Sequence, residues 1–415
     1  MQNVLDILQE RNYIEQMTHP EEMKKMFSEK SCVPFYIGFD PTADSLHVGH
    51  FVSLMVASYM QKCGHKPILL MGGGTAMIGD PSGKTDMRKM LTQEDIQHNV
   101  DSIKKQVENF VSFDGENGAI IVNNADWLLD LKYIEFMREI GSKFTISKML
   151  AAECYKARLE EGLTFFEMGY MLMQSYDFLY LYNKYGCKLE MGGNDQWSNI
   201  IGGVELIRKI GKDDSYGLTF KLLTTKEGKK MGKTEKGALW LDPEKTSPYE
   251  FYQYWRNIED ESVYTVGSML TFLPMEEVKR LASLKDEQIN EAKKILAFEI
   301  TKLVHGEVEA KKAEEAATAL FEGKGSVENM PKVKLSDPYC SITQAIVECN
   351  ICGSKSQAKT LISQGAISLN DEKITDIGYM LSEKDYEVAH TILKKGKKIF
   401  YCLEKWKNGT ELIFH

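Results

Sequence analysis

The sequence lacks any long apolar run. None of its 415 residues lies in a segment approaching the roughly 20 apolar residues that span a bilayer. The first residues, Met1 to Asp6, also lack a basic head followed by an apolar core, so no secretory signal is visible, and they are too acidic for a typical transit peptide. These absences predict a cytoplasmic protein.

The sequence also lacks the regular cysteine spacing of a disulfide-bonded protein. The eight cysteines are scattered, which does not suggest a disulfide framework. Cys349 and Cys352 have the spacing of a metal-binding pair, but a structural zinc site needs four ligands and the sequence has no second pair. We therefore expect no structural metal, and interpret the two cysteines as apolar positions of a helix.

The chain has no overall excess of positive charge, since its net charge is −9. The charge is uneven, however, because residues 331–415 carry 12 lysines and 10 acidic residues. A locally basic module on an acidic body is typical of selective contact with a polyanion rather than of general adhesion to one.

What the sequence does contain is an alternation of short apolar strands and amphipathic helices. The strands are predicted at 34–39, 66–71, 119–123 and 188–191, after a largely helical segment at 1–33. This alternation predicts an α/β fold with a Rossmann-like, doubly wound parallel sheet, in which ligands bind outside the carboxyl ends of the strands.

Strand signals fade after about residue 247, where long helical patterns take over. A polar, glycine-containing break follows, and then a small α+β unit. We expect four parts, with these bounds: 1–222, the sheet domain; 223–322, a loop and an α-helical domain; 323–337, a linker; and 338–415, the small unit.

The segment from Tyr36 to His50 joins a strand to a helix through a polar turn that holds Thr42, His47 and His50. The first N–H groups of a helix have no internal partner and the dipole is positive there, so such a turn attracts phosphate. The alternative interpretation is a helix start that a histidine caps.

A glycine-rich segment follows the second strand. It nearly matches a phosphate-binding loop, but Ile78 occupies the position that needs glycine. Lys84 and Arg88 could still reach a phosphate, and Asp80 could pair with a ligand amino group. A glycine-rich turn with a solvated carboxylate is the alternative.

Tyr170, Gln174 and Asp177 share one face of an otherwise apolar helix. Buried polar groups need partners, so this stripe meets either a polar ligand or an internal hydrogen-bond network.

Two further segments complete a nucleotide site. Gly192 and Gly193 permit close approach of a flat ligand, and Asp195 could accept from ribose hydroxyls. Lys230 to Thr234 could clamp a triphosphate, although a solvated basic loop is the alternative. Together these groups suit displacement of pyrophosphate by a substrate carboxylate, in which positioning and charge stabilisation dominate.

At this point the chain resembles the class I aminoacyl-tRNA synthetases, and among them the bacterial-type tyrosyl-tRNA synthetase family, over essentially its whole length. His47-Val48-Gly49-His50 matches the HIGH element of the family, and Lys230-Met231-Gly232-Lys233-Thr234 matches a variant of its KMSKS element. The resemblance implies that 223–322 carries the KMSKS loop and an anticodon-side domain, and that 338–415 binds RNA.

The resemblance also implies residue roles. Thr42 and His47 would stabilise the leaving pyrophosphate. The mobile loops over the phosphates would contribute Lys84, Arg88, Lys230, Lys233 and Thr234. The ATP site would comprise Gly38, Asp40, His50, Gly192, Gly193, Asp195 and Lys233.

For the amino acid, the family pattern implies that the amino group is bound by Asp80, Tyr170 and Gln174. Gln196 would bind the carboxylate, and Tyr36 and Asp177 would read the phenolic hydroxyl. Asn124 and Trp127 would shape the pocket nearby.

Some positions depart from the family pattern. Ile37 replaces a cysteine that can bond the ribose in some relatives, and Glu190 stands where some have glutamine, so the roles of these two positions are open.

The implied substrates are L-tyrosine, ATP with Mg²⁺, and tRNA(Tyr), and the implied assembly is a homodimer. Two alternatives stay open, namely a tryptophanyl-tRNA synthetase and a non-catalytic RNA-binding protein on a synthetase scaffold.

Overall fold

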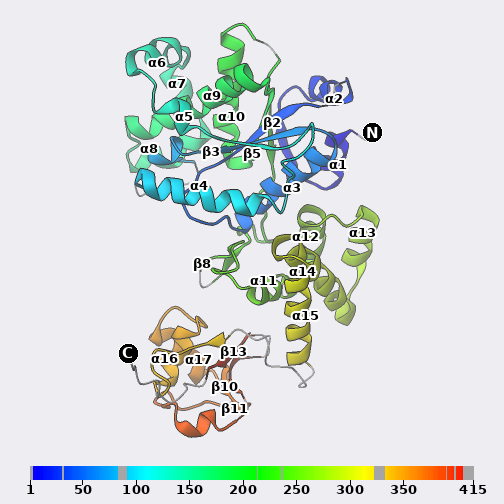
Figure 1. Ribbon diagram of the computed structural model, residues 1–415, viewed down its shortest axis with the longest axis vertical. Helices are drawn as coiled ribbons and strands as arrows, with labels where there is room; N and C mark the ends of the chain where they lie inside the picture. The colour runs from blue at the N-terminus through cyan, green and yellow to red at the C-terminus, as the bar shows by residue number, and fades with distance from the viewer. Residues whose placement is uncertain are drawn as a thin grey trace, which may run out of the picture. The chain divides into compact units, whose positions relative to one another are not determined.

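A six-stranded sheet forms the centre of the first part of the computed structural model (Figure 1). The structure describes residues 3–29, 32–82, 91–212, 214–234, 237–321, 332–388, 390–396 and 399–404. The strand order is β1-β6-β5-β2-β3-β4, and all neighbours are parallel except β1 and β6. The strands are β1 (Ile14–Met17), β2 (Pro34–Phe39), β3 (Lys66–Met71), β4 (Ile120–Asn123), β5 (Leu189–Gly193) and β6 (Tyr216–Phe220).

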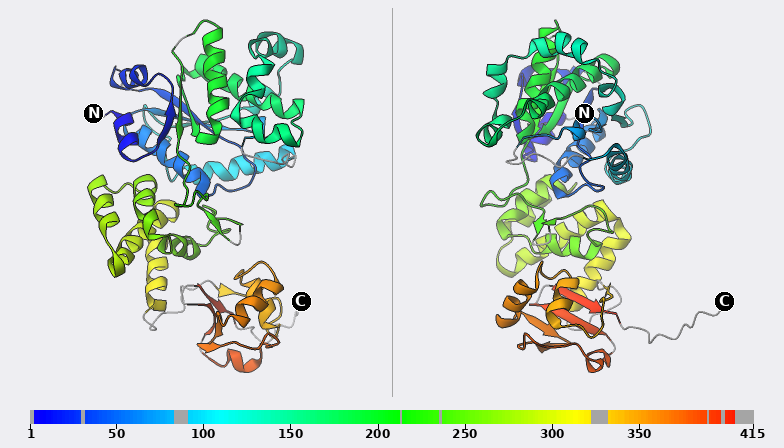
Figure 2. Two further views of the ribbon diagram at one scale, coloured as in Figure 1. Left: turned by 180° about the vertical axis from the view of Figure 1, so that it is seen from behind. Right: turned by 90° about the vertical axis from the view of Figure 1, so that its left-hand side faces the viewer.

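Helices cover both sides of this sheet. Figures 1 and 2 show α3 (Val48–Lys62) and α4 (Gln93–Val107) along one side, and α9 (Phe165–Tyr185) and α10 (Trp197–Lys209) along the other. This arrangement confirms the predicted Rossmann-like, doubly wound fold. The smaller helices of this part are α1 (Val4–Glu10), α2 (Pro20–Glu29), α5 (Ala125–Leu128), α6 (Tyr133–Glu139), α7 (Ile146–Leu150) and α8 (Glu153–Glu161).

The strand order reverses between β2 and β5, and these two strands separate before the carboxyl end of β2. The pairing of β2 with β5 ends at Ile37 and Met191, whereas β2 pairs with β3 up to Phe39. Beyond Ile37, Gly38 is exposed although it belongs to a central strand. Ligands of doubly wound sheets bind at such a switch point, outside the carboxyl ends of the strands.

All four predicted strands are present, as β2 to β5. The prediction of a helical segment at 1–33 is wrong in part, because β1 lies between α1 and α2 and pairs with β6. The sequence analysis also missed β6.

Two compact units divide the chain, and they do not follow the sequence in single blocks. Unit 1 comprises Met1–Met231, Trp240–Asp242 and Glu261–Ser283, and unit 2 the rest. The predicted helices after residue 247 are confirmed. They are α11 (Pro248–Arg256), α12 (Val263–Leu270), α13 (Met275–Ser283), α14 (Ile289–His305) and α15 (Glu307–Phe321).

The last part of unit 2 contains a five-stranded sheet of order β11-β10-β12-β13-β9, with α16 (Ile342–Glu348) and α17 (Lys355–Ser363) (Figure 2). Its strands are β9 (Lys332–Val333), β10 (Ile367–Leu369), β11 (Glu372–Lys373), β12 (Thr391–Lys395) and β13 (Ile399–Leu403). β9 falls within the segment predicted as a linker. Cys349 and Cys352 are buried in an apolar core here, but they lie in the turn after α16 rather than on a helix.

No helix among the described residues is both long and apolar enough to cross a membrane.

Candidate active site

A buried carboxylate, Asp177 on α9, lies at one end of the candidate site. Its Oδ2 accepts from Asn124 Nδ2 at 2.9 Å, and its Oδ1 accepts from Trp127 Nε1 at 2.7 Å. Burial raises the pKa of Asp177 well above its ordinary value, although both hydrogen bonds oppose that rise. The structure therefore provides a buried carboxylate whose two oxygens are each fixed by a donor from the segment after β4.

Beside Asp177 lie three buried polar atoms that have no hydrogen bond of good geometry among the described residues. They are the Tyr36 hydroxyl, Gln174 Oε1 and Glu190 Oε2. Tyr36 and Glu190 are register partners on β2 and β5, and Gln174 Nε2 donates to Glu190 Oε1 at 2.9 Å. A buried polar group without a partner costs roughly 1–3 kcal/mol. Three such atoms together mark a place where a polar ligand completes the network.

A second network joins Tyr170 to the end of β2. The Tyr170 hydroxyl donates to Asp40 Oδ2 at 2.9 Å, and Thr75 Oγ1 donates to Asp40 Oδ1 at 3.0 Å. Asn124 Nδ2 also approaches Thr75 Oγ1 at 3.0 Å, which links this network to Asp177. A Cβ on Gly72 would lie 2.2 Å from Asp40 Oδ1, so glycine is required there. Thr75 is not among the residues predicted from the sequence, although the glycine run before it was a signal for a close approach here.

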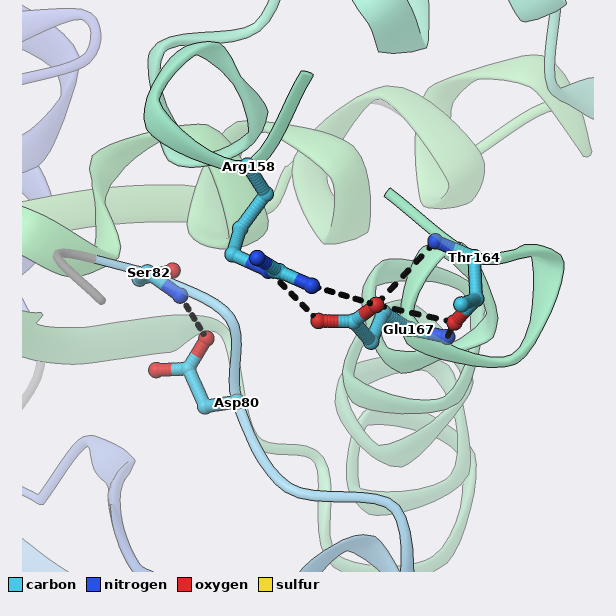
Figure 3. Close-up of polar contacts among 5 residues, drawn as sticks. All are labelled: Asp80, Ser82, Arg158, Thr164 and Glu167. Atoms are coloured by element: carbon cyan, nitrogen blue, oxygen red, sulfur yellow. Dashed lines mark hydrogen bonds and ion pairs between the residues drawn. The ribbon is translucent and has the colours of Figure 1, made fainter. Parts of the chain in front are cut away.

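Asp80 is buried and held in place by two donors. Gln196 Nε2 donates to its Oδ2 at 2.6 Å. The Ser82 N–H donates to its Oδ1 at 2.9 Å (Figure 3). The loop after β3 and the short turn after β5 therefore meet at this carboxylate, as the sheet topology requires.

A buried ion pair fixes the start of α9, the helix that carries three site residues (Figure 3). Arg158 Nε donates to Glu167 Oε1 at 2.8 Å, and Glu167 Oε2 accepts from the Thr164 N–H at 3.0 Å. The Arg158 guanidinium lowers the pKa of Glu167 from 4.5 to about 2. Helix α9 thus begins at an anchored turn.

The two histidines cap α3. His47 Nδ1 accepts from the Gly49 N–H at 3.0 Å, and His50 Nδ1 accepts from the His47 N–H at 3.2 Å. Their rings stack with centroids 4.1 Å apart. Because both Nδ1 atoms accept, the proton of each ring is on Nε2 when the ring is neutral. A Cβ on Gly49 would lie 2.7 Å from His47 Cε1, which explains the glycine in this motif.

The residues predicted for the nucleotide lie at the same edge of the sheet. Gly38 is the first residue of β2 beyond the part that pairs with β5, and Gly192 and Gly193 end β5. Thr42 and Asp195 are both exposed. A Cβ on Gly193 would lie 2.7 Å from Asp195 Oδ1, so this turn is closely packed.

The structure describes only some of the loop residues predicted to contact phosphate. Lys84 and Arg88 lie outside the described residues. Lys230 is exposed in unit 1, whereas Lys233 and Thr234 form β7 (Lys233–Thr234) in unit 2, paired with β8 (Gly237–Ala238). Their convergence with the histidines on one ligand stays a prediction. Within the described ranges, no cluster of three or more His, Cys, Asp or Glu side chains could hold a metal ion.

Comparison with known proteins agrees with this geometry. Residues 28–322 match the family "tRNA synthetases class I (W and Y)", and residues 322–403 match the "Tyrosine--tRNA ligase SYY-like C-terminal domain". A tyrosine–tRNA ligase of Caldanaerobacter subterraneus subsp. tengcongensis is 58% identical over 403 residues, which are 97% of this chain and 99% of the relative. The chain belongs to the tyrosyl-tRNA synthetase family.

Other members of the tyrosyl-tRNA synthetase family support this assignment. A tyrosine–tRNA ligase of Clostridium botulinum is 57% identical over 406 residues, covering 97% of this chain and all of that relative. The solved structure of a C-terminally truncated mitochondrial tyrosyl-tRNA synthetase from Aspergillus nidulans has a TM-score of 0.68 at 29% identity, and the match covers 77% of this chain and 94% of that one. A tryptophanyl-tRNA synthetase of Encephalitozoon cuniculi shares the fold, with a TM-score of 0.54 at 11% identity, over 74% of this chain and 87% of that one.

Proposed function

We propose that this protein is an ATP-dependent tyrosine–tRNA ligase that uses the pocket described above to select tyrosine. The carboxylate of L-tyrosine attacks the α-phosphorus of ATP and pyrophosphate leaves, which gives tyrosyl-adenylate. A hydroxyl of the terminal ribose of tRNA(Tyr) then takes the tyrosyl group and AMP leaves. Family membership supports the reaction, and the pocket supports the substrate.

One observation carries the choice of substrate, namely the buried Tyr36 hydroxyl, which has no hydrogen bond of good geometry and lies close to Asp177. A phenolic hydroxyl both donates and accepts, so it can donate to Asp177 and accept from Tyr36. An indole N–H only donates, and it would leave Tyr36 without an acceptor. Phenylalanine would satisfy neither group. Tyrosine is therefore favoured over tryptophan and phenylalanine.

The other end of the amino acid would be held by polar groups around Asp80. Asp80, Tyr170 and Gln174 supply acceptors for the ammonium group. Gln196, whose side-chain amide lies against Asp80, would turn to donate to the carboxylate. The Tyr170 hydroxyl donates to Asp40 in the structure, so binding the ammonium group would use its remaining oxygen lone pairs.

The nucleotide would occupy the switch point beside α3. His47 and His50 present Nε2–H donors, Thr42 offers its hydroxyl, and the start of α3 favours negative charge. Gly38, Gly192 and Gly193 leave room for adenosine, and Asp195 would accept from ribose. Mg²⁺ would enter with ATP as part of the substrate.

The loop residues would close over the phosphates. We assign this role to Lys84, Arg88, Lys230, Lys233 and Thr234. These cations would stabilise charge that develops on the leaving pyrophosphate.

We further propose a homodimer. Unit 1 exposes a series of large apolar side chains on and around α6, α7 and the start of α9. They are Leu129, Tyr133, Ile134, Ile146 and Phe165, each more than half exposed. Large exposed apolar patches mark interaction sites, and a second copy of the chain is the partner that the family implies.

The four-part division of the chain at 1–222, 223–322, 323–337 and 338–415 is also retained as a proposal. The last part would contact tRNA.

Tyrosine-dependent exchange of pyrophosphate into ATP tests the proposed function. We expect exchange with tyrosine and little with tryptophan or phenylalanine at equal concentrations. Exchange that prefers tryptophan, or no exchange together with retained RNA binding, would contradict the assignment and favour one of the two alternatives.

A further inference from the structure

Glu190 is the one carboxyl group in the proposed tyrosine pocket to which the family pattern assigns no role. It is 1% exposed and lies on β5 opposite Tyr36. A Cβ on Gly203 of α10 would lie 3.0 Å from Glu190 Oε2, so the absence of a side chain at Gly203 makes room for this carboxyl. The position is therefore built to hold a carboxyl group beside the hydroxyl that faces the substrate.

Two hydrogen-bonding positions surround this carboxyl. Its Oε1 accepts from Gln174, whereas its Oε2 is buried without a hydrogen bond of good geometry. The Tyr36 hydroxyl, also unsatisfied, lies close enough that each group shifts the pKa of the other. Oε2 and the Tyr36 hydroxyl are thus the natural partners once a ligand orders the pocket.

The number of protons decides how these groups can pair. The substrate phenol has one hydroxyl proton, which it donates in a hydrogen bond to Asp177. An ionised Glu190 only accepts, so it would draw the Tyr36 proton, and Tyr36 could then offer the phenol only lone pairs. The lone pairs of the Tyr36 oxygen would then face those of the phenol oxygen, with no proton between the two atoms. A protonated Glu190 removes this conflict because it donates to Tyr36.

Burial raises the pKa of both carboxyl groups, Asp177 as well as Glu190, so we assign the proton from the hydrogen-bond donors around each group and place it on Glu190. Asp177 is stabilised as an anion by donors on both oxygens, whereas Glu190 has one well-formed donor. Burial raises the pKa of Glu190 to about 7. The titratable groups that face it are Tyr36 from β2, Asp177 from α9 and Cys187 before β5, and α10 presents Gly203.

We propose that Glu190 sets the affinity for tyrosine through its protonation state. The carboxylic acid donates to the Tyr36 oxygen, the Tyr36 hydroxyl donates to the substrate phenol, and the phenol donates to Asp177. Ionisation of Glu190 breaks this chain at Tyr36. The inference rests on the proposed function and adds a specificity-determining residue to it.

The test measures KM for tyrosine in pyrophosphate exchange between pH 6 and pH 8. In the proposal, the pocket binds tyrosine well only when Glu190 is protonated. The KM for tyrosine should therefore rise about tenfold over this range, with a smaller change in kcat. The preference for tyrosine over phenylalanine should fall in parallel, because phenylalanine does not use the Tyr36 hydroxyl. A role in folding alone would not produce that selective change.

Glu190→Gln is the decisive variant. Its amide can accept from Gln174 and donate to Tyr36 at every pH, so KM should stay near the low-pH wild-type value throughout. Glu287→Gln, at an exposed position, is the matched control and should keep the wild-type profile. Equilibrium dialysis with labelled tyrosine gives the same comparison if exchange by the variant is slow.

Two outcomes separate the inference from the proposed function. A wild-type KM that is constant with pH, or one that changes equally in wild type and Glu190→Gln, would overturn the role of Glu190 and leave the function intact. Absence of tyrosine-dependent exchange in wild type at every pH would overturn both.

Discussion

The proposed tyrosine pocket depends on three polar side chains of one helix, α9. Helical spacing predicts that Tyr170, Gln174 and Asp177 share a face, and the structure places them together. Spacing leaves open whether they meet a ligand or one another. Asp177 and Tyr170 have protein partners, whereas Gln174 Oε1 has none within the described residues. The partners come from distant segments, so only the fold reveals them.

The glycine between the two histidines gives a sharp prediction. In Gly49→Ala, the new methyl group would lie 2.7 Å from the His47 ring and displace it. We expect kcat for pyrophosphate exchange to fall on the order of 10- to 100-fold, because a donor to the phosphates moves, with KM for tyrosine little changed.

Gly169→Ala is the matched control for that experiment. Gly169 lies inside α9 and a Cβ there would meet nothing within 4 Å. Helix propensity predicts a gain in stability of roughly 0.5–1 kcal/mol and unchanged kcat. Equal loss of kcat in both variants would contradict the role of the His47 position.

At the scale of the element, the sequence predicts strands and helices where local pattern is strong. Strands β2 to β5 are apolar and follow helices with clear stripes. The short strand β1 pairs with β6, which lies about 200 residues away in the chain. The local sequence of β1 therefore carries no signal of the strand that it pairs with. Tertiary pairing, rather than propensity, makes it a strand.

The buried Arg158–Glu167 ion pair at the start of α9 is expected to stabilise the folded protein. Glu167→Gln would leave Arg158 buried without its counter-charge, so the free energy of unfolding at pH 7 should fall by about 3 kcal/mol. Urea denaturation measures this loss. Glu277→Gln breaks an exposed pair with Arg280 and should change stability little. Similar losses in the two variants would show that burial of the Arg158–Glu167 pair is unimportant.

The same pair predicts a pH dependence. The folded-state pKa of Glu167, about 2, lies below its ordinary value of 4.5. The pair therefore stabilises the folded state fully above about pH 4.5, and this contribution of about 3 kcal/mol is lost as the pH falls toward 2. The difference in unfolding free energy between wild type and Glu167→Gln should accordingly shrink between pH 5 and pH 3. A difference that is constant over this range would argue against the ion pair as its source.

At the scale of the whole molecule, charge distribution and exposed apolar surface point to two kinds of partner. The sequence reveals the basic last part directly, because charge can be counted. It does not reveal that apolar residues of α6 and α7 are exposed, because a sequence pattern would assign such residues to a core.

The proposed dimer predicts a mass of about twice 47.2 kDa in sedimentation equilibrium. Ile134 on α6 is 73% exposed and belongs to the set of exposed apolar residues proposed for the dimer contact. Ile134→Asp should shift the equilibrium to monomer, because a charge buried in an apolar interface lacks a partner. A monomeric wild type, or a variant that dimerises equally well, would contradict the assigned surface.

In the proposed site, Tyr36 and Asp177 read the phenolic hydroxyl of the substrate. The most direct measurement is the ratio of kcat/KM for tyrosine to that for phenylalanine in pyrophosphate exchange, compared between wild type and Asp177→Asn, with thermal unfolding as a check on folding. We predict that the ratio falls on the order of 10- to 100-fold, because a hydrogen bond to the phenolic hydroxyl of tyrosine is lost while phenylalanine loses nothing. An unchanged ratio in a folded variant would contradict the account.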